Sequence, residues 1–179
     1  MKKHRGMRSL DVVVLLKIAA LRESTWFVRD LAYTLGISQS EVSESLNRSR
    51  IAGLLAEDKK RVLKSNLLDF LEYGLRYVFP AEPSAIQRGM PTAHSAPPLQ
   101  NSISSDEFYV WPWAEGKVRG QAIEPLHSGV PKACAKDSAL YELLALADAI
   151  RLGRVREKQQ AIEELRLRVL NTEMPPVRN

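Results

Sequence analysis

Cysteine and histidine are scarce in this chain of 179 residues. There is one cysteine, Cys134, and the three histidines, His4, His94 and His127, lie far apart in the sequence. A single cysteine forms no disulfide within the chain and cannot hold a metal ion by itself. The histidines lack the paired spacing that places two imidazole rings on one face of a helix. The sequence therefore predicts no metal site and no cofactor, and it is typical of a reducing compartment.

Sequence motifs of catalysis are missing as well. The chain has no glycine-rich phosphate-binding loop, no Gly-x-Ser-x-Gly turn and no pair of carboxylates in a distinctive setting. Cys134 stands between two alanines, a context more typical of a small buried residue than of a reactive thiol. We predict that the protein is not an enzyme.

Long hydrophobic runs are absent too. The most apolar stretch, Leu10 to Leu21, is interrupted by Asp11 and Lys17 and is too short to cross a hydrocarbon layer of about 30 Å. It continues into Arg22 without the small residues of a signal-peptide cleavage site. We therefore expect no membrane partner and a cytoplasmic protein.

The excess of positive over negative charge is confined to the first third of the chain. Residues 1–64 carry 13 Lys and Arg against 7 Asp and Glu, whereas residues 65–179 carry 13 against 14. A basic excess suits a polyanion, because neutralised phosphates release counterions and supply most of the nonspecific affinity. A basic segment is also compatible with a solvated surface that binds nothing. The choice between this interpretation and polyanion binding therefore depends on the motif that the segment contains.

A turn between two short predicted helices is the most informative motif. Leu31, Ala32 and Leu35 have the spacing of one helical face, and Gly36 adopts a left-handed conformation at little cost. The first helix of the pair is therefore expected to stop at Gly36, and Ile37 fills the turn.

The second helix of the pair begins after Ser38, which suits an N-cap, with Glu41 three residues later completing a capping box. Val42 and Leu46 form its inward stripe. Its outer face presents small polar groups, which hydrogen-bond base edges in a major groove. The predicted base contacts are Gln39, Ser40, Ser43 and Asn47.

This segment resembles the helix-turn-helix of bacterial winged-helix transcription regulators of the MarR-like kind. The matching positions are Leu31, Ala32, Leu35, Gly36, Ile37, Val42 and Leu46. With flanking helices and a wing, the resemblance covers residues 1–78, and it implies sequence-specific binding to double-stranded DNA. A helix–glycine–helix corner also occurs in three-helix bundles that bind no DNA.

Affinity for DNA is expected to come from groups around the second helix. The predicted phosphate contacts are Ser38, Arg48, Arg50, Lys59, Lys60, Arg61, Lys3 and Arg5. The last two belong to a basic arm, and Lys59 to Arg61 belong to the tip of a short wing, residues 57–62. A run of charged residues is equally typical of an exposed turn.

One short recognition helix covers only a few base pairs. We therefore expect a homodimer that binds two half-sites about 34 Å apart and acts as a repressor, in association with the nucleoid. The dimer contact is expected from the first helix of the chain or from the last.

The chain divides into four predicted segments, and the fold class is mainly α. The segments are a flexible basic arm (1–8), a winged helix-turn-helix domain (9–79), a Pro-rich, loop-dominated layer (80–137), and C-terminal helices for packing or dimerisation (138–171). Ser9 or Asp11 is expected to cap the first helix, and Thr25 the second. A single helix is expected over residues 64–79, with Val78 facing inward.

The middle layer holds eight of the ten prolines, and helical periodicity fails there. Its aromatic residues are too apolar for disorder, and residues 108–111 suit a short strand. Trp111 and Trp113 either frame an aromatic pocket or pack in the core. We expect this layer to receive a protein partner or a small-molecule effector.

The C-terminal region is predicted to be helical from Ser138, with a break at Gly153. A narrow apolar stripe of Val155, Ile162, Leu165 and Val169 continues beyond the break, as in a helix packed along one side against one partner.

A protein-interaction function remains an alternative. Glu41 and Glu44 lie on the predicted outer face of the second helix, where carboxylates repel phosphates unless they accept a hydrogen bond from cytosine. In that case the winged helix is a scaffold, and the protein is an antitoxin-like or complex-forming subunit.

Overall fold

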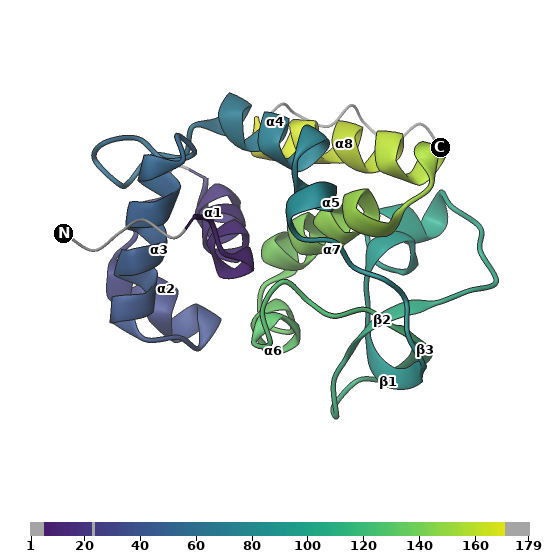
Figure 1. The fold of residues 1–179 in the computed structure, drawn as a ribbon. Helices are drawn as coiled ribbons and strands as arrows, with labels where there is room; N and C mark the ends of the chain where they lie inside the picture. The colour runs from purple at the N-terminus through teal and green to yellow at the C-terminus, as the bar shows by residue number, and fades with distance from the viewer. Residues whose placement is uncertain (1–5, 23, 171–179) are drawn as a thin grey trace.

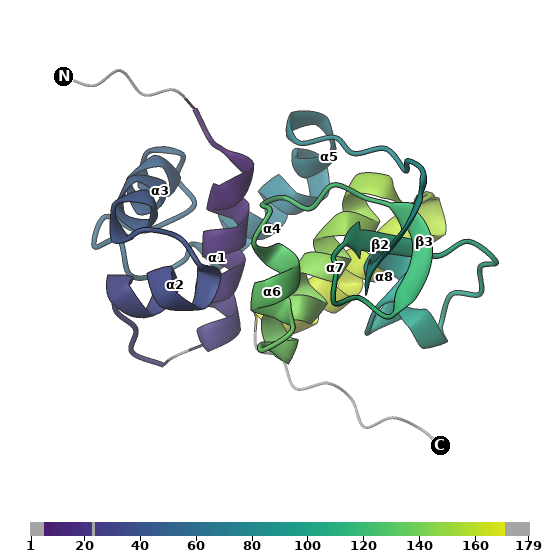
Figure 2. The same cartoon turned by 90° about the horizontal axis from the view of Figure 1, so that it is seen from below.

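The computed structural model describes residues 6–22 and 24–170, and its fold is mainly α, as predicted (Figure 1). Eight α-helices and one small three-stranded sheet lie in these two ranges. Helices α2 and α3 lie at one end of the molecule and the sheet lies at the other, with α1 between them (Figure 2). None of the described helices combines the length and apolarity needed to traverse a bilayer.

Helix α1 (Ser9–Leu21) is buried at every residue from Leu10 to Ala19. It contacts α2 (Val28–Leu35) and α3 (Gln39–Ile51) as well as α7 (Ser138–Leu152) and α8 (Val155–Val169). A helix that is apolar on most of its circumference is stable only when neighbours cover it on several sides. The predicted extent of this helix is confirmed, and its apolar surface is used within the chain rather than left for a second copy.

The turn between α2 and α3 has the predicted geometry. Gly36 ends α2 in the left-handed region, at φ 67° and ψ 34°. The Oγ of Ser38 accepts a hydrogen bond from the Glu41 backbone N–H at 3.1 Å, and Glu41 Oε2 accepts one from the Ser38 N–H at 2.9 Å. The capping box is therefore confirmed. The predicted inward residues of the two helices are buried: Leu31, Ala32, Leu35, Val42 and Leu46.

The predicted caps of α1 and α2 were wrong. Arg8 is the N-cap of α1, and Asp11, at the third helical position, accepts its backbone N–H at 2.8 Å. Phe27 rather than Thr25 is the N-cap of α2, where Asp30 accepts the Phe27 N–H at 3.2 Å. In both helices the acidic side chain reaches back to the cap, so the cap residue needs no polar group of its own.

The single helix predicted over 64–79 is two helices, α4 (Lys64–Tyr73) and α5 (Leu75–Val78). Gly74 separates them, and a Cβ atom there would lie 2.9 Å from the Phe70 ring. Four leucines on the inner side are buried, namely Leu67, Leu68, Leu71 and Leu75. Val78, predicted to face inward with them, is 52% exposed because the break turns it toward solvent.

The middle segment holds more regular structure than predicted. Strands β1 (Ile86–Pro91), β2 (Tyr109–Pro112) and β3 (Val118–Ala122) pair with one another in a small closed sheet, in which β1 is antiparallel to both of the others. Only the strand near residues 108–111 was predicted. Two short 3-10 helices and one helical turn complete the segment: η1 (Ala93–Ser95), η2 (Leu99–Asn101) and α6 (Val130–Cys134).

Glycine permits this close strand packing. A Cβ atom at Gly89 would lie 2.0 Å from the backbone oxygen of Trp111, and one at Gly120 would lie 2.5 Å from that of Phe108. No other residue type fits such backbone contacts. Strands β1 and β3 were not predicted because each contains a glycine, Gly89 or Gly120, and glycine usually indicates a turn.

The C-terminal helices begin and end close to the prediction. Asp137 caps α7 by accepting the Leu140 N–H at 3.0 Å. Helix α8 packs along α7 and also contacts α4, so its narrow stripe is covered within the chain. Leu165 and Val169 are buried there, whereas Val155 is 76% exposed and does not belong to the stripe.

A buried carboxylate joins the middle segment to α7. Asp148 Oδ2 accepts hydrogen bonds from Trp111 Nε1 at 2.6 Å and from Thr92 Oγ1 at 2.7 Å, and Oδ1 accepts one from Arg151 at 2.7 Å. Trp111 is 1% exposed, so it packs in the core and does not frame an aromatic pocket with Trp113.

We expect Asp148→Ala to destabilise the protein by about 3–5 kcal/mol, because it leaves the Arg151 guanidinium buried without its carboxylate. Urea unfolding followed by circular dichroism measures the change. Glu163→Ala, at an exposed position of α8, is the control and should stay within about 0.5 kcal/mol of the wild type. Equal stability of both variants would contradict a supporting role for Asp148.

Candidate nucleic-acid interface

The outward face of α3 carries most of the predicted base contacts. Gln39, Ser40 and Ser43 are exposed on it, as is Ser38 at its N-cap. Asn47, one turn farther along, is half-buried and accepts a hydrogen bond from Arg50 at 3.5 Å. The first two turns of α3 therefore offer hydroxyl and amide groups to a partner, and Asn47 offers less.

The two glutamates on this helix are both engaged. Hydrogen bonds from the backbone and side chain of Ser38 lower the pKa of Glu41, so its carboxylate is held in the ionised form at the positive end of the helix. Glu44 lies 3.8 Å from a guanidinium nitrogen of Arg48. Both carboxylates nevertheless stay charged and exposed, because Ser38 is neutral and Arg48 already pairs with Asp11, so they still disfavour contact with phosphates.

Arg48 does not lie where a phosphate contact requires it. Its guanidinium is buried and donates two hydrogen bonds to Asp11 of α1, from Nε to Oδ2 at 2.9 Å and from Nη2 to Oδ1 at 2.7 Å. The Asp11 side chain is fully buried, so the pair fixes α3 on α1. The sequence predicted an outward cation because charged residues near a helix end usually face solvent, and the buried Asp11 reverses that expectation.

A short hairpin follows α3 where the wing was predicted. Leu55 and Val62 form one antiparallel bridge, and backbone bonds from Ala56 to Arg61 and from Leu63 to Leu54 extend the pairing. Asp58 closes the tip by accepting the backbone N–H groups of Lys60 and Arg61, which lowers its pKa. We call residues 54–63 the hairpin.

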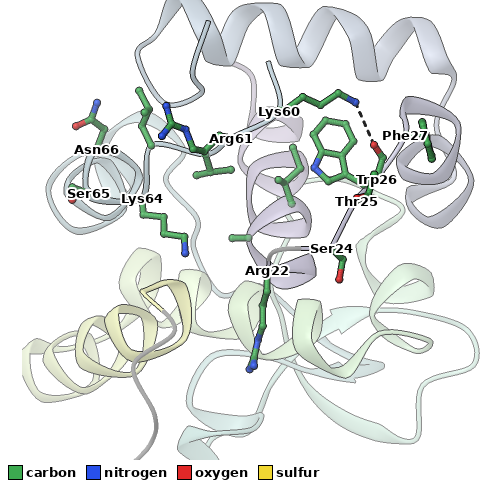
Figure 3. Close-up of a pocket in the computed structure, with 14 residues that line it drawn as sticks. Arg22, Ser24, Thr25, Trp26, Phe27, Lys60, Arg61, Lys64, Ser65 and Asn66 are labelled. Carbon is green, nitrogen blue, oxygen red and sulfur yellow. Dashed lines mark hydrogen bonds between the residues drawn. The ribbon is translucent and has the colours of Figure 1, made fainter. Parts of the chain in front are cut away.

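The cations of the hairpin point in different directions. Lys59, at the tip, adopts a left-handed conformation with φ 55°, and Arg61 is exposed. Lys60 turns back instead: its Nζ donates to the Trp26 carbonyl at 3.2 Å and lies 4.2 Å from the centre of the indole ring (Figure 3). Arg50, at the end of α3, forms an ion pair with Glu57 of the hairpin at 3.1 Å. The predicted contacts Lys3 and Arg5 lie outside the described residues.

A pocket of about 880 Å³ opens beside the hairpin (Figure 3). It lies between the end of α1, the extended segment 24–27, the hairpin and the first turn of α4. Its lining includes two cations, Arg22 and Lys64, that the sequence analysis did not single out. Neither belongs to a motif. Lys64 follows the hairpin directly in the sequence, whereas only the fold brings Arg22 near it.

The residues considered for other chemistry are spread through the fold. Cys134 is buried, as expected of a small core residue, and burial raises the pKa of its thiol. His94 is buried, and its Nε2 lies 2.8 Å from the Glu107 carbonyl oxygen. Among the described side chains, no group of three or more His, Cys, Asp or Glu is placed to hold a metal ion.

No protein-family model, curated protein or solved structure matches this chain.

We expect Arg48→Ala to destabilise the protein by about 3–5 kcal/mol, because Asp11 would keep a buried charge without its partner. The double variant Asp11→Leu with Arg48→Met should lose less stability than the summed losses of Asp11→Leu alone and Arg48→Met alone. Urea unfolding measures all three stabilities. Additive losses would contradict the ion pair. Arg29→Ala, at an exposed position of α2, is the control and should leave stability within about 0.5 kcal/mol of the wild type.

We also expect Ser38→Ala to raise the pKa of Glu41 part of the way toward the ordinary glutamate value of about 4.3, because it removes the hydroxyl hydrogen bond and keeps the larger contribution of the backbone N–H. Because the pKa of Glu41 is lower in the folded state than in the unfolded state, the capping interaction stabilises α3 when the pH is above the ordinary glutamate pKa. This stabilisation is lost as the pH falls through the pKa of the folded state. Carboxyl chemical shifts in an NMR titration measure the change. Ser40→Ala is the control and should leave the Glu41 titration unchanged, and an unchanged titration in Ser38→Ala would contradict the capping role.

Proposed function

We propose that this protein is a sequence-specific, double-stranded DNA-binding transcriptional regulator of the winged helix-turn-helix, MarR-like kind. In this proposal α2, the Gly36 turn and α3 form the helix-turn-helix, and the hairpin is the wing. The observation that carries it is the exposed polar face at the start of α3, in a helix that is followed by a hairpin bearing three cations. A helix held rigidly on its inner side and polar on its outer side suits insertion into a major groove.

The first two turns of α3 would supply sequence preference. The Gln39 amide suits the N6 and N7 groups of adenine, and the hydroxyls of Ser40 and Ser43 suit several base edges. Asn47 would reach a base only by giving up its hydrogen bond with Arg50. We therefore assign it a smaller part than the sequence suggested.

Affinity would come mainly from beside the helix, because the exposed face of α3 is polar rather than basic. Lys59 and Arg61 are exposed cations of the hairpin whose side chains are not turned back as that of Lys60 is. The Ser38 hydroxyl lies at the positive end of α3 but would contact a phosphate only by giving up its hydrogen bond to Glu41. Arg48 is removed from the proposed phosphate contacts because its guanidinium binds Asp11. Lys3 and Arg5 of the arm stay in the proposal on sequence grounds alone.

A homodimer and repression at a promoter belong to the same proposal, since one α3 covers only a few base pairs. The apolar surfaces of α1 and α8 are used inside the chain, so the dimer contact would lie elsewhere. This role would place the protein in the cytoplasm with the nucleoid.

The second candidate function is that of a protein-interaction or antitoxin-like subunit. It is favoured by large apolar side chains exposed outside the first three helices: Tyr77 is 77% exposed, Ile86 63% and Phe108 52%. Retention on heparin at low salt distinguishes the two functions, because a scaffold that does not bind DNA should elute early.

The test of the DNA-binding function uses fragments of the native genome selected for binding, with affinity measured by fluorescence anisotropy. Gln39→Ala and Ser43→Ala should reduce discrimination between selected and random fragments by about tenfold each. Lys59→Ala should weaken binding to all fragments alike and lower the slope of log affinity against log salt by about one.

Lys117→Ala, at an exposed lysine between β2 and β3, is the matched control and should change neither quantity. Failure to select any fragment, together with early elution from heparin, would overturn the DNA-binding function. Equal effects of all three test variants on discrimination would overturn the division of roles between α3 and the hairpin.

A further inference from the structure

Two arginines stand directly opposite each other on the small sheet. The register of β1 and β3 pairs Arg88 with Arg119, and both residues are exposed. Directly opposed residues of antiparallel strands place their side chains on the same face of the sheet, close together. Neither guanidinium forms an ion pair with another described residue. Two like charges in this position destabilise the strand pair, and a bound anion would remove that cost.

An open hollow of about 610 Å³ lies beside these arginines. Besides Arg88 and Arg119, its lining consists of Ile86, Gln87, Pro112, Trp113 and Ala114. No aspartate or glutamate is among the described residues that line it. The backbone N–H of Trp113 donates to the Arg88 carbonyl at 3.2 Å, which fixes Trp113 beside β1. The hollow thus combines two cations with an aromatic ring and a mostly apolar lining.

Trp113 differs from the other two tryptophans in what surrounds its ring. Lys60 covers the Trp26 ring, and the Trp111 N–H donates to Asp148. Trp113 is half-buried, and among the described residues no cation and no aromatic ring lies against its indole. A large ring at the edge of a hollow is a platform on which another planar ring stacks.

We propose that this hollow binds single-stranded nucleic acid. Arg88 and Arg119 pair with phosphates of the strand, and a base stacks on Trp113. The guanidinium fork fits phosphate oxygens, and every base has a planar face, so the site has little sequence preference. A duplex fits poorly, because its bases are already stacked on one another.

The form of the hollow favours a chain over a free nucleotide. Sites for small molecules bury most of their ligand, whereas this hollow is open and both arginines are exposed. A strand that continues beyond the hollow has a phosphate on each side of the stacked base, so each arginine meets a different one. An acidic peptide would also offset the two charges, but its carboxylates supply no ring for Trp113.

The sheet lies at the end of the molecule opposite α2 and α3 (Figure 2). Double-stranded DNA at α3 would therefore leave the hollow accessible. The inference goes beyond the proposed function and does not depend on it. It gives the middle segment a nucleic-acid partner, where the sequence predicted a protein partner or a small-molecule effector.

Binding is tested by fluorescence anisotropy with the full chain and a labelled oligothymidylate. A strand of the same length without bases should bind about tenfold more weakly, because it retains the phosphates and loses the stacking. Equal affinity for the two strands would overturn the role of Trp113. Tighter binding of oligoglutamate, or equal affinity for thymidine 5′-monophosphate, would overturn single-stranded nucleic acid as the occupant.

Arginine variants locate the phosphate contacts. Arg88→Gln combined with Arg119→Gln should weaken oligothymidylate binding about tenfold and lower the slope of log affinity against log salt by about 1.4. Arg88→Lys combined with Arg119→Lys keeps both charges and should retain the slope. Arg76→Gln combined with Lys132→Gln removes two exposed cations elsewhere and should bind as the wild type does. Circular dichroism checks each fold, and unchanged binding in the first pair would overturn the proposal.

Variants of Trp113 test the stacking separately from the charge. Trp113→Ala should bind the oligothymidylate and the strand without bases with equal affinity, and its salt slope should match that of the wild type. Trp113→Phe keeps a ring and should retain part of the preference for the strand with bases. A full preference in Trp113→Ala would contradict stacking at this position.

Selected double-stranded fragments separate this site from the proposed function. The variant with Arg88→Gln and Arg119→Gln should bind them as the wild type does, and Lys59→Ala should leave oligothymidylate binding unchanged. A protein that binds the oligothymidylate but no duplex would retain this site and overturn the proposed regulatory function. A protein that binds duplex, but binds oligothymidylate no better than the arginine variant does, would overturn this site alone.

Discussion

The orientation of α1 depends on two ion pairs, one with α3 and one with the residue that begins α7. Asp11 holds Arg48 of α3, and Lys17 Nζ lies 2.6 Å from Asp137 Oδ2, the residue that caps α7. A charge taken out of water is tolerated only when a partner and further hydrogen bonds satisfy it. The two pairs therefore fix where α3 and α7 sit on a helix whose other contacts are apolar and have little directional preference.

The elements that could be predicted are those whose signals lie within a few residues of one another. Gly36 and the Ser38–Glu41 capping box act over one turn, and each has the expected geometry. The strands β1 and β3 depend instead on contacts between residues about thirty positions apart, such as Arg88 opposite Arg119. Sequence patterns carry little information on such pairing, because the side chains of a closed, partly exposed sheet do not alternate regularly.

The residues of the candidate site that could be predicted are likewise those that a local pattern places. The polar face of α3 follows from helical periodicity, so Gln39, Ser40 and Ser43 could be placed from the sequence. The position of Arg48 could not, because its partner is 37 residues away and belongs to another helix. The pocket beside the hairpin likewise draws on four segments of the chain, and no local motif links Arg22 with Lys64.

The burial of α1 on all sides has a consequence for how the chain is made. The helix is synthesised before α7 and α8, so the surface it presents to them is covered only after residues 138–169 have been added. Until then about half of an apolar helix stays in contact with water, and a fragment that ends before α7 keeps it so permanently. The first 79 residues are therefore a poor unit for transfer to another protein, although they contain all the elements of the proposed DNA-binding motif.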